Sequence, residues 1–203
     1  MITSYFMKTI LYIFFLSFLF TSSASADFKL GVDAYIANDY VTAYKELKPF
    51  AEQGNADAQQ KLGYMYVTGQ GVTQDYKEAV KWYYLAAGQG NDHAQYNLGM
   101  MYLDGRGVTQ DYTEAAKWFR LAAHQGNVHA HYNLGWLYWQ GKGVIKNYVL
   151  SHMWFNIAAI NGDQEAEKAR AALEIQIKSK EKIARAKKLA RECIENHYKN
   201  CRL

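Results

Sequence analysis

The sequence predicts an all-α protein, an α-solenoid of antiparallel helix pairs with a 36-residue period. The main observation is a repeated segment: GVTQDYKEAVKWYYLAAGQGN begins at Gly71 and GVTQDYTEAAKWFRLAAHQGN at Gly107. A weaker copy, GVIKNYVLSHMWFNIAAINGD, begins at Gly143, again 36 residues further on. Composition agrees, because the 203 residues include one proline and half of them are apolar. A fixed period of this length is typical of solenoids, whose units stack to bury a shared core.

The first helix of each unit carries an apolar stripe. In the second unit the stripe is Ala94, Leu98 and Tyr102, spaced four residues apart. Gly99 lies inside this helix, where glycine costs about 1 kcal/mol, so we expect it to leave a slot for a bulky neighbour. The loop GRGV follows, and its glycines suit a backbone with positive φ.

The second helix of each unit begins at an acidic residue. Asp111 is expected to cap this helix, and Glu114 to complete a capping box. Gly126 should end it, and Asn127 is placed to begin the next helix. The equivalent capping residues one unit earlier are Asp75 and Glu78.

Together these positions form the pattern A-x3-L-G-x2-Y-x2-G-x-G-V-x2-D-x3-A-x2-W-x3-A-A-x2-G. It resembles the Sel1-like repeat, a relative of the tetratricopeptide repeat, over roughly residues 34–162. The resemblance implies a right-handed superhelix whose first helices line a concave face, and a role as adaptor or scaffold in protein complexes, often in exported bacterial proteins. The third unit departs from the pattern at Asn147, Ser151 and Met153, which indicates a terminal or specialised unit.

The expected domains are a signal peptide at 1–26, a repeat solenoid at 27–162 and capping helices at 163–203. The solenoid divides into a partial unit at about 27–57 and units at 58–93, 94–129 and 130–165. Three features favour a cleaved secretory signal: the basic Lys8, an apolar run of 11 residues from Ile10 to Phe20, and Ala24-Ser25-Ala26 before Asp27. The alternative is an uncleaved membrane anchor. We therefore expect a periplasmic or secreted protein, cleaved after Ala26.

The C-terminal segment is basic, whereas the rest of the expected mature chain is acidic. Residues 178–203 hold nine Lys/Arg and three Asp/Glu, and residues 27–177 hold 13 and 16. A basic amphipathic helix can contact an anionic membrane surface, and the simpler alternative is the solvated face of a capping helix.

Cys193 and Cys201 are expected to form a disulfide in an oxidising compartment. This requires the helix to end between them, near His197 or Asn200, because eight residues of helix span about 12 Å; the alternative is two unpaired thiols.

Extra aromatic and sulfur-containing residues recur on the first helices, in addition to the stripe. Such columns suit the binding of a protein or peptide partner in a groove, and the alternative is that they form inter-helix core. Tyr96 and Tyr132 form a neighbouring column, and asparagines at one repeat position suit recognition of a peptide backbone. The predicted partner-binding residues are Tyr64, Asn97, Met100, Met101, Asn133, Trp136 and Trp139.

No motif indicates an enzyme. His124, His129 and His131 lack the spacing of a zinc site, so no metal or other cofactor is expected. Ser179–Lys182 spells S-x-x-K without the further motifs of serine lactamases. The family resemblance implies one alternative, peptidoglycan or β-lactam binding with weak β-lactamase-like activity, but the cysteine pairs within successive repeats of those relatives are absent. An acidic body argues against nucleic-acid binding.

Overall fold

The computed structural model describes residues 28–199 and 201. Within them the chain forms helices and loops and no strand, which confirms the predicted all-α class. Residues 28–36 are helical. The helices that follow are α2 (Tyr40–Glu52), α3 (Ala56–Thr68), α4 (Tyr76–Gly88), α5 (Asp92–Asp104), α6 (Tyr112–Ala123), α7 (Val128–Gln140), α8 (Tyr148–Ile160), α9 (Gln164–Ile177) and α10 (Lys180–Glu195).

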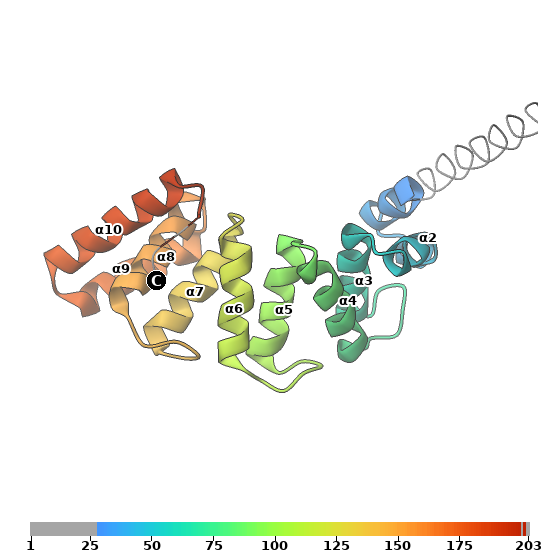
Figure 1. Ribbon diagram of the computed structural model, residues 1–203, viewed down its shortest axis with the longest axis horizontal. Helices are drawn as coiled ribbons and strands as arrows, with labels where there is room; N and C mark the ends of the chain where they lie inside the picture. The colour runs from blue at the N-terminus through green and yellow to red at the C-terminus, as the bar shows by residue number, and fades with distance from the viewer. Residues whose placement is uncertain (1–27, 200, 202–203) are drawn as a thin grey trace, which may run out of the picture.

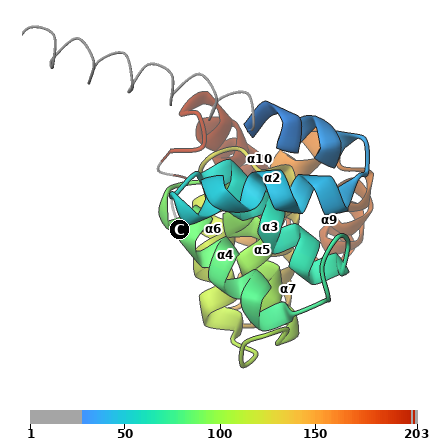
Figure 2. The same cartoon turned by 90° about the vertical axis from the view of Figure 1, so that its right-hand side faces the viewer.

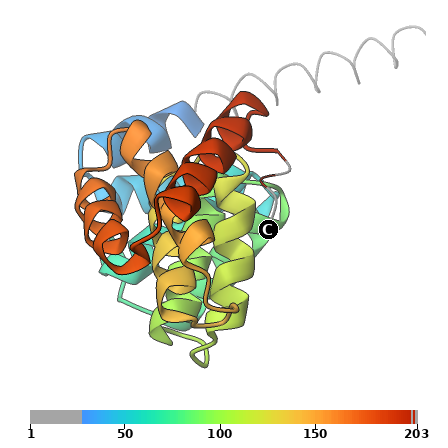
Figure 3. The same ribbon diagram turned by 90° about the vertical axis from the view of Figure 1, so that its left-hand side faces the viewer.

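The helices pack as consecutive antiparallel pairs in a solenoid. The pairs α3–α4, α5–α6 and α7–α8 correspond to the three repeats, and each pair packs on the next. They follow one another along the long axis of the molecule, from α2 at one end to α9 and α10 at the other (Figure 1). Figure 2 looks along this row from the α2 end and Figure 3 from the α10 end. The predicted signal peptide, residues 1–26, lies outside the described residues.

A glycine in each first helix receives an aromatic ring from its paired second helix. A Cβ atom on Gly99 would lie 2.6 Å from the ring of Phe119. Phe119 is completely buried, so its ring has no room to move away. The expected slot at Gly99 is confirmed, and the same slot recurs for Gly63 with Tyr83 and Gly135 with Phe155.

The loops between paired helices also use glycine for close approach. Gly107 has a φ of 72°, as predicted for this loop, and its missing Cβ would lie 2.3 Å from the carbonyl oxygen of Tyr76. Tyr76 is the first residue of α4, so the loop of one unit rests on the second helix of the unit before. Gly71 and Gly143 make the equivalent contacts with Tyr40 and Tyr112.

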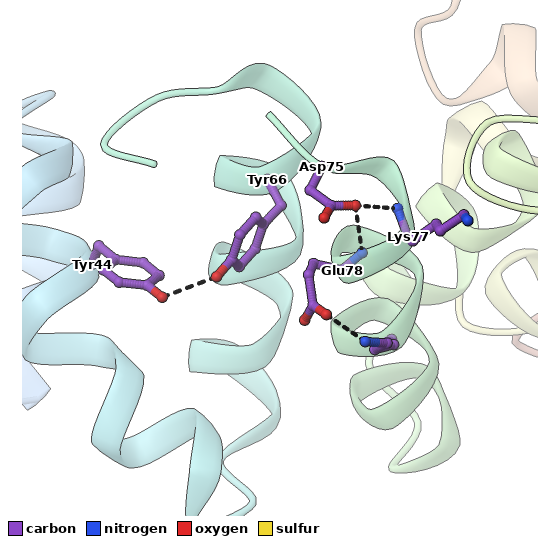
Figure 4. Close-up of polar contacts among 6 residues, drawn as sticks. Tyr44, Tyr66, Asp75, Lys77 and Glu78 are labelled. Atoms are coloured by element: carbon purple, nitrogen blue, oxygen red, sulfur yellow. Dashed lines mark hydrogen bonds and ion pairs between the residues drawn. The ribbon is translucent and has the colours of Figure 1, made fainter. Parts of the chain in front are cut away.

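The second helices begin at the predicted caps, but the capping box is incomplete. Asp75 Oδ1 accepts hydrogen bonds from the backbone N–H groups of Lys77 and Glu78, at 2.9 and 3.1 Å (Figure 4). The box would also need Glu78 to accept from the N–H of Asp75. That N–H instead donates to the carbonyl oxygen of Tyr66 at 3.0 Å, and Glu78 pairs with Lys81. The predicted hydrogen bond from the backbone N–H of the cap to the glutamate was therefore wrong. The same holds one unit later, because the N–H of Asp111 donates to the carbonyl oxygen of Tyr102 and Glu114 pairs with Lys117.

The third unit is specialised, because its second helix is enclosed by the C-terminal cap. Residues 151–158 of α8 are all buried, since α9 and α10 both pack on α8. Met153 lies where the earlier units carry the exposed Lys81 and Lys117. The departure at Met153 therefore follows from burial of a face that is otherwise solvated, whereas Asn147 remains exposed and Ser151 lies at a position that is buried in every unit.

The chain folds back after α10 and closes a disulfide between Cys193 and Cys201, whose Cα atoms lie 4.8 Å apart. The turn that achieves this uses left-handed backbone at His197 and Tyr198, with φ of 51° and 61°. This confirms the predicted disulfide and the predicted turn near His197, while Asn200 lies outside the described residues.

Replacing Gly99 with Ala should destabilise the protein. The new methyl group would overlap the Phe119 ring, and overpacking of this kind costs roughly 1–3 kcal/mol, which exceeds or cancels the gain in helix propensity of about 1 kcal/mol. Gly88→Ala is the matched control, because a Cβ there meets nothing within 4 Å, and we expect it to stabilise by about 0.5–1 kcal/mol. Urea unfolding measures both, and a Gly99→Ala protein more stable than Gly88→Ala would contradict the slot.

Candidate functional site

The predicted column Tyr64, Met100 and Trp136 reaches the surface of the first helices. Tyr64 on α3 is 37% exposed, and Met100 and Trp136 are partly buried. Tyr64 lies beside Tyr35 of the helical segment 28–36, with ring centroids 6.1 Å apart. These side chains thus contribute both to packing between helices and to the accessible surface.

Trp136 and Trp139 form a stacked pair on α7. Their ring centroids lie 4.9 Å apart and the ring planes differ by 23°. Both rings meet the buried Phe155 edge-on, and Trp139 Nε1 donates a hydrogen bond of 2.8 Å to Gln176 Oε1 on α9. The pair is therefore fixed by α8 and α9, while both rings remain partly exposed.

Met101 does not belong to this surface. It is 3% exposed and packs in the core with Leu98 and Tyr83, so it offers no area to a partner and the prediction is corrected. Met65 and Leu137 occupy the same repeat position as Met101 and are equally buried, so this whole column belongs to the core.

Two hollows lie along the first helices. The larger has a volume of about 760 Å³, and its lining includes Tyr96 and Met100 from α5, Tyr132 from α7, and the start of α9. The smaller, about 330 Å³, lies beside Trp136 and extends to the end of α5 and the loop after it. Asn133 lines both hollows, so they adjoin at this side chain, and we call the two hollows together the groove.

Asparagine side chains are partly buried at the predicted positions. Asn133 Nδ2 donates to the carbonyl oxygen of His129 at 2.9 Å, which holds the amide against its own helix at the junction of the two hollows. Asn97, its equivalent on α5, is also partly buried, but it lines neither hollow. The structure therefore places Met100, Asn133 and Trp136 on the groove, and Tyr64 and Asn97 outside its two hollows.

The groove has a negative electrostatic environment at Tyr96. Burial raises the pKa of the Tyr96 phenol, Asn133 opposes this shift, and the carboxylates of Asp104 and Asp163 reinforce it. Asp104 ends α5 and Asp163 caps α9, so the charges come from both ends of the groove. The sequence analysis missed Asp163 and Glu165, because nothing in the repeat pattern placed the start of α9 against α5 and α7.

The histidines have structural roles where they are buried. His131 is completely buried, and its Nε2 lies 3.0 Å from the carbonyl oxygen of Ala123. Gln59 and Gln95 occupy the same repeat position and donate to equivalent carbonyl oxygens. His152 is likewise buried and its Nε2 lies 2.7 Å from Glu174 Oε1, linking α8 to α9. Among residues 28–199 and 201, no group of three or more His, Cys, Asp or Glu side chains could hold a metal ion.

Ser179 acts as a helix cap. Its hydroxyl accepts from the backbone N–H of Lys182 at 3.3 Å and donates to Glu181 at 2.8 Å, so the S-x-x-K segment is the first turn of α10.

The exposed surface of α10 carries both positive and negative side chains, with Glu192 beside Lys188 at 3.8 Å. Such a mixed surface favours the solvated capping face, and contact with an anionic membrane stays a prediction. No helix in the described part of the chain is long and apolar enough to cross a bilayer.

Comparison with models of protein families shows which family this chain belongs to. The Sel1 repeat matches residues 56–91, 92–127 and 128–163, which together make up more than half of the chain. The protein belongs to the Sel1 repeat family. Each match begins two residues before the unit boundary expected from the sequence, and coincides with the start of α3, α5 and α7. Proteins with Sel1 repeats generally mediate protein–protein interactions and are typically non-enzymatic scaffolds.

Solved structures support the same family. The chain is 35% identical to c5321, described as a protective antigen present in uropathogenic Escherichia coli strains, with a TM-score of 0.74 over 82% of this chain and 37% of that one. It is 36% identical to a Sel1 repeat protein from Oxalobacter formigenes, with a TM-score of 0.69 over 73% and 61% of the two chains. The Helicobacter pylori cysteine rich protein B shares the fold at 21% identity, with a TM-score of 0.50 over 63% and 92%. The chain thus spans about a third of c5321 and three fifths of the Oxalobacter protein, and no curated protein matches it.

His131 should make the protein less stable in acid. Burial lowers the pKa of His131 to about 4, whereas an unfolded histidine titrates near 6.5. Because the unfolded state binds the proton first, the free energy of unfolding should fall as pH drops from about 6.5 to about 4, by up to about 3 kcal/mol from this residue.

The matched variant is His131→Gln, since glutamine makes the same hydrogen bond at Gln59 and Gln95. Urea unfolding at pH 7, 5 and 4 should show a smaller loss for this variant than for the wild type. Equal losses in both proteins would contradict a neutral, buried His131.

Proposed function

We propose that this protein is an exported interaction module that binds a partner protein or peptide in the groove of its first helices, in the periplasm or outside the cell. One observation carries the proposal: partly exposed Tyr96, Met100, Tyr132 and Trp136 line two adjoining hollows along the first helices. Aromatic and methionine side chains of this kind dominate the energy of protein interfaces.

Contacts with neighbouring rings already order the aromatic side chains of the groove. Trp136 is stacked on Trp139, and Tyr132 and Trp136 both contact the buried ring of Phe155. Side chains that are already ordered lose less conformational entropy on binding, which favours affinity. The family's general role in protein–protein interaction supports the same function.

A photo-crosslinking amino acid placed at Met100 in cells should capture a protein partner, and adding Trp136→Ala should abolish the capture. The matched control carries the same crosslinker at Tyr84, which is 57% exposed on α4 and lies outside the groove. Circular dichroism of each variant checks that the helices persist. Equal capture from position 84, or capture at position 100 that survives Trp136→Ala, would contradict binding in the groove.

Export is tested by the N-terminus of the protein recovered from cells. The apolar run and the Ala24-Ser25-Ala26 segment support signal cleavage, so mass spectrometry of protein from the cell envelope or medium should find Asp27 as the first residue. Replacing Ala24 and Ala26 with larger residues should leave the precursor uncleaved. Recovery of the whole chain with Met1 or Met7 at its start would count against the signal peptide.

A further inference from the structure

The larger hollow of the groove is lined by two kinds of side chain. We call the aromatic and apolar ones its floor: Tyr96 and Met100 from α5, Tyr132 from α7, and Val128. We call the start of α9, with Asp163 and Glu165, its acidic wall. The residues that line this hollow include these two carboxylates and neither lysine nor arginine.

These carboxylates leave the hollow with a net negative charge. Asp163 caps α9, and its Oδ1 accepts from the N–H of Ala166 at 2.9 Å. The partial charge at a helix N-terminus is about +0.5, so it offsets only about a quarter of the charge on the two residues. Glu165 pairs with Lys168 at 2.7 Å, but both side chains are about two-thirds exposed or more. Water screens such surface pairs strongly, so Glu165 remains available to a second cation.

We propose that this hollow receives a lysine or arginine side chain of the protein partner, an inference that rests on the function proposed above. The aliphatic stem of that side chain packs on the floor, as long basic side chains do on apolar surfaces. Its charged end lies towards Asp163 and Glu165. The rings of Tyr96 and Tyr132 also line the hollow, and aromatic rings attract cations electrostatically.

The size of this hollow and the position of the adjoining one extend the inference to the neighbouring residue of the partner. A volume of about 760 Å³ exceeds what one side chain fills and leaves room for the backbone on either side of it. The adjoining hollow is lined by several polar side chains, but it also contains Trp136 and Leu103, which suit an apolar side chain. The partner segment is therefore one in which a basic residue lies close to an apolar residue, and an acidic segment is disfavoured by repulsion from the wall.

The chain offers variants that remove the charge and keep the fold. Asp163→Asn keeps the helix cap, because asparagine caps as well as aspartate, and Glu165→Gln keeps the shape of the side chain. Glu167→Gln is the matched control, since Glu167 is exposed in the same turn of α9 but lines neither hollow. All three proteins should unfold at similar urea concentrations.

The experiment probes a random peptide array with the wild-type protein and with Trp136→Ala, and then measures the affinity of the best peptides that depend on Trp136. We expect these peptides to be enriched in Lys or Arg next to apolar residues. The Asp163→Asn/Glu165→Gln protein should bind them about tenfold more weakly, whereas Glu167→Gln should change binding less than twofold. Replacing the arginine of a peptide with its uncharged analogue citrulline should cause the same tenfold loss in the wild type.

The outcomes separate this inference from the proposed function. Peptides that depend on Trp136 but lack basic residues, or that bind the double variant unchanged, overturn the cation site and leave the interaction module standing. If no peptide depends on Trp136, the proposed groove function fails and the cation site fails with it.

Discussion

The spacing of the solenoid depends on one contact, a buried aromatic ring inserted against a helical glycine within each pair. The Phe119 ring occupies the space where a Cβ of Gly99 would lie, so α5 and α6 approach more closely than any other residue would permit. This closeness positions the loop after α5, where Gly107 rests on the first carbonyl of α4. The contact within a pair and the contact between units are therefore linked, because a shift of either helix would move the loop away from its neighbour.

Buried amides add a second, polar link between units. Gln59 donates to the carbonyl oxygen of Ala51 at 2.9 Å and accepts from Gln89 at 2.8 Å. One side chain thus forms hydrogen bonds with the end of α2 and with the residue after α4. Gln95 and Gln125 repeat this arrangement one unit later. A buried amide that is fully paired specifies register, since a displaced unit would leave polar groups unpaired at a cost of about 1–3 kcal/mol each.

The sequence predicted those features that each unit repeats, and missed those that depend on distant parts of the chain. The helix pairs, the slot at Gly99 and the caps at Asp75 and Asp111 follow from local spacing, and all are present. The capping box failed because the N–H that Glu78 needed already binds Tyr66, nine residues earlier. Met101 was misplaced because a helical stripe does not show which of its neighbours faces the core. The acidic wall of the groove was missed because it comes from α9, beyond the repeats.

At the end of the solenoid, His131 and the residues around it connect the C-terminal cap to the groove. His131 replaces the repeated glutamine, and Tyr198 of the C-terminal turn packs on its ring with centroids 5.1 Å apart. Tyr198 also donates a hydrogen bond of 3.2 Å to Asn161, which takes the place of Gln89 and Gln125. Asn161 lines the larger hollow. The turn closed by the disulfide therefore supports one wall of the groove, so the specialised third unit both terminates the solenoid and shapes the surface proposed to bind a partner.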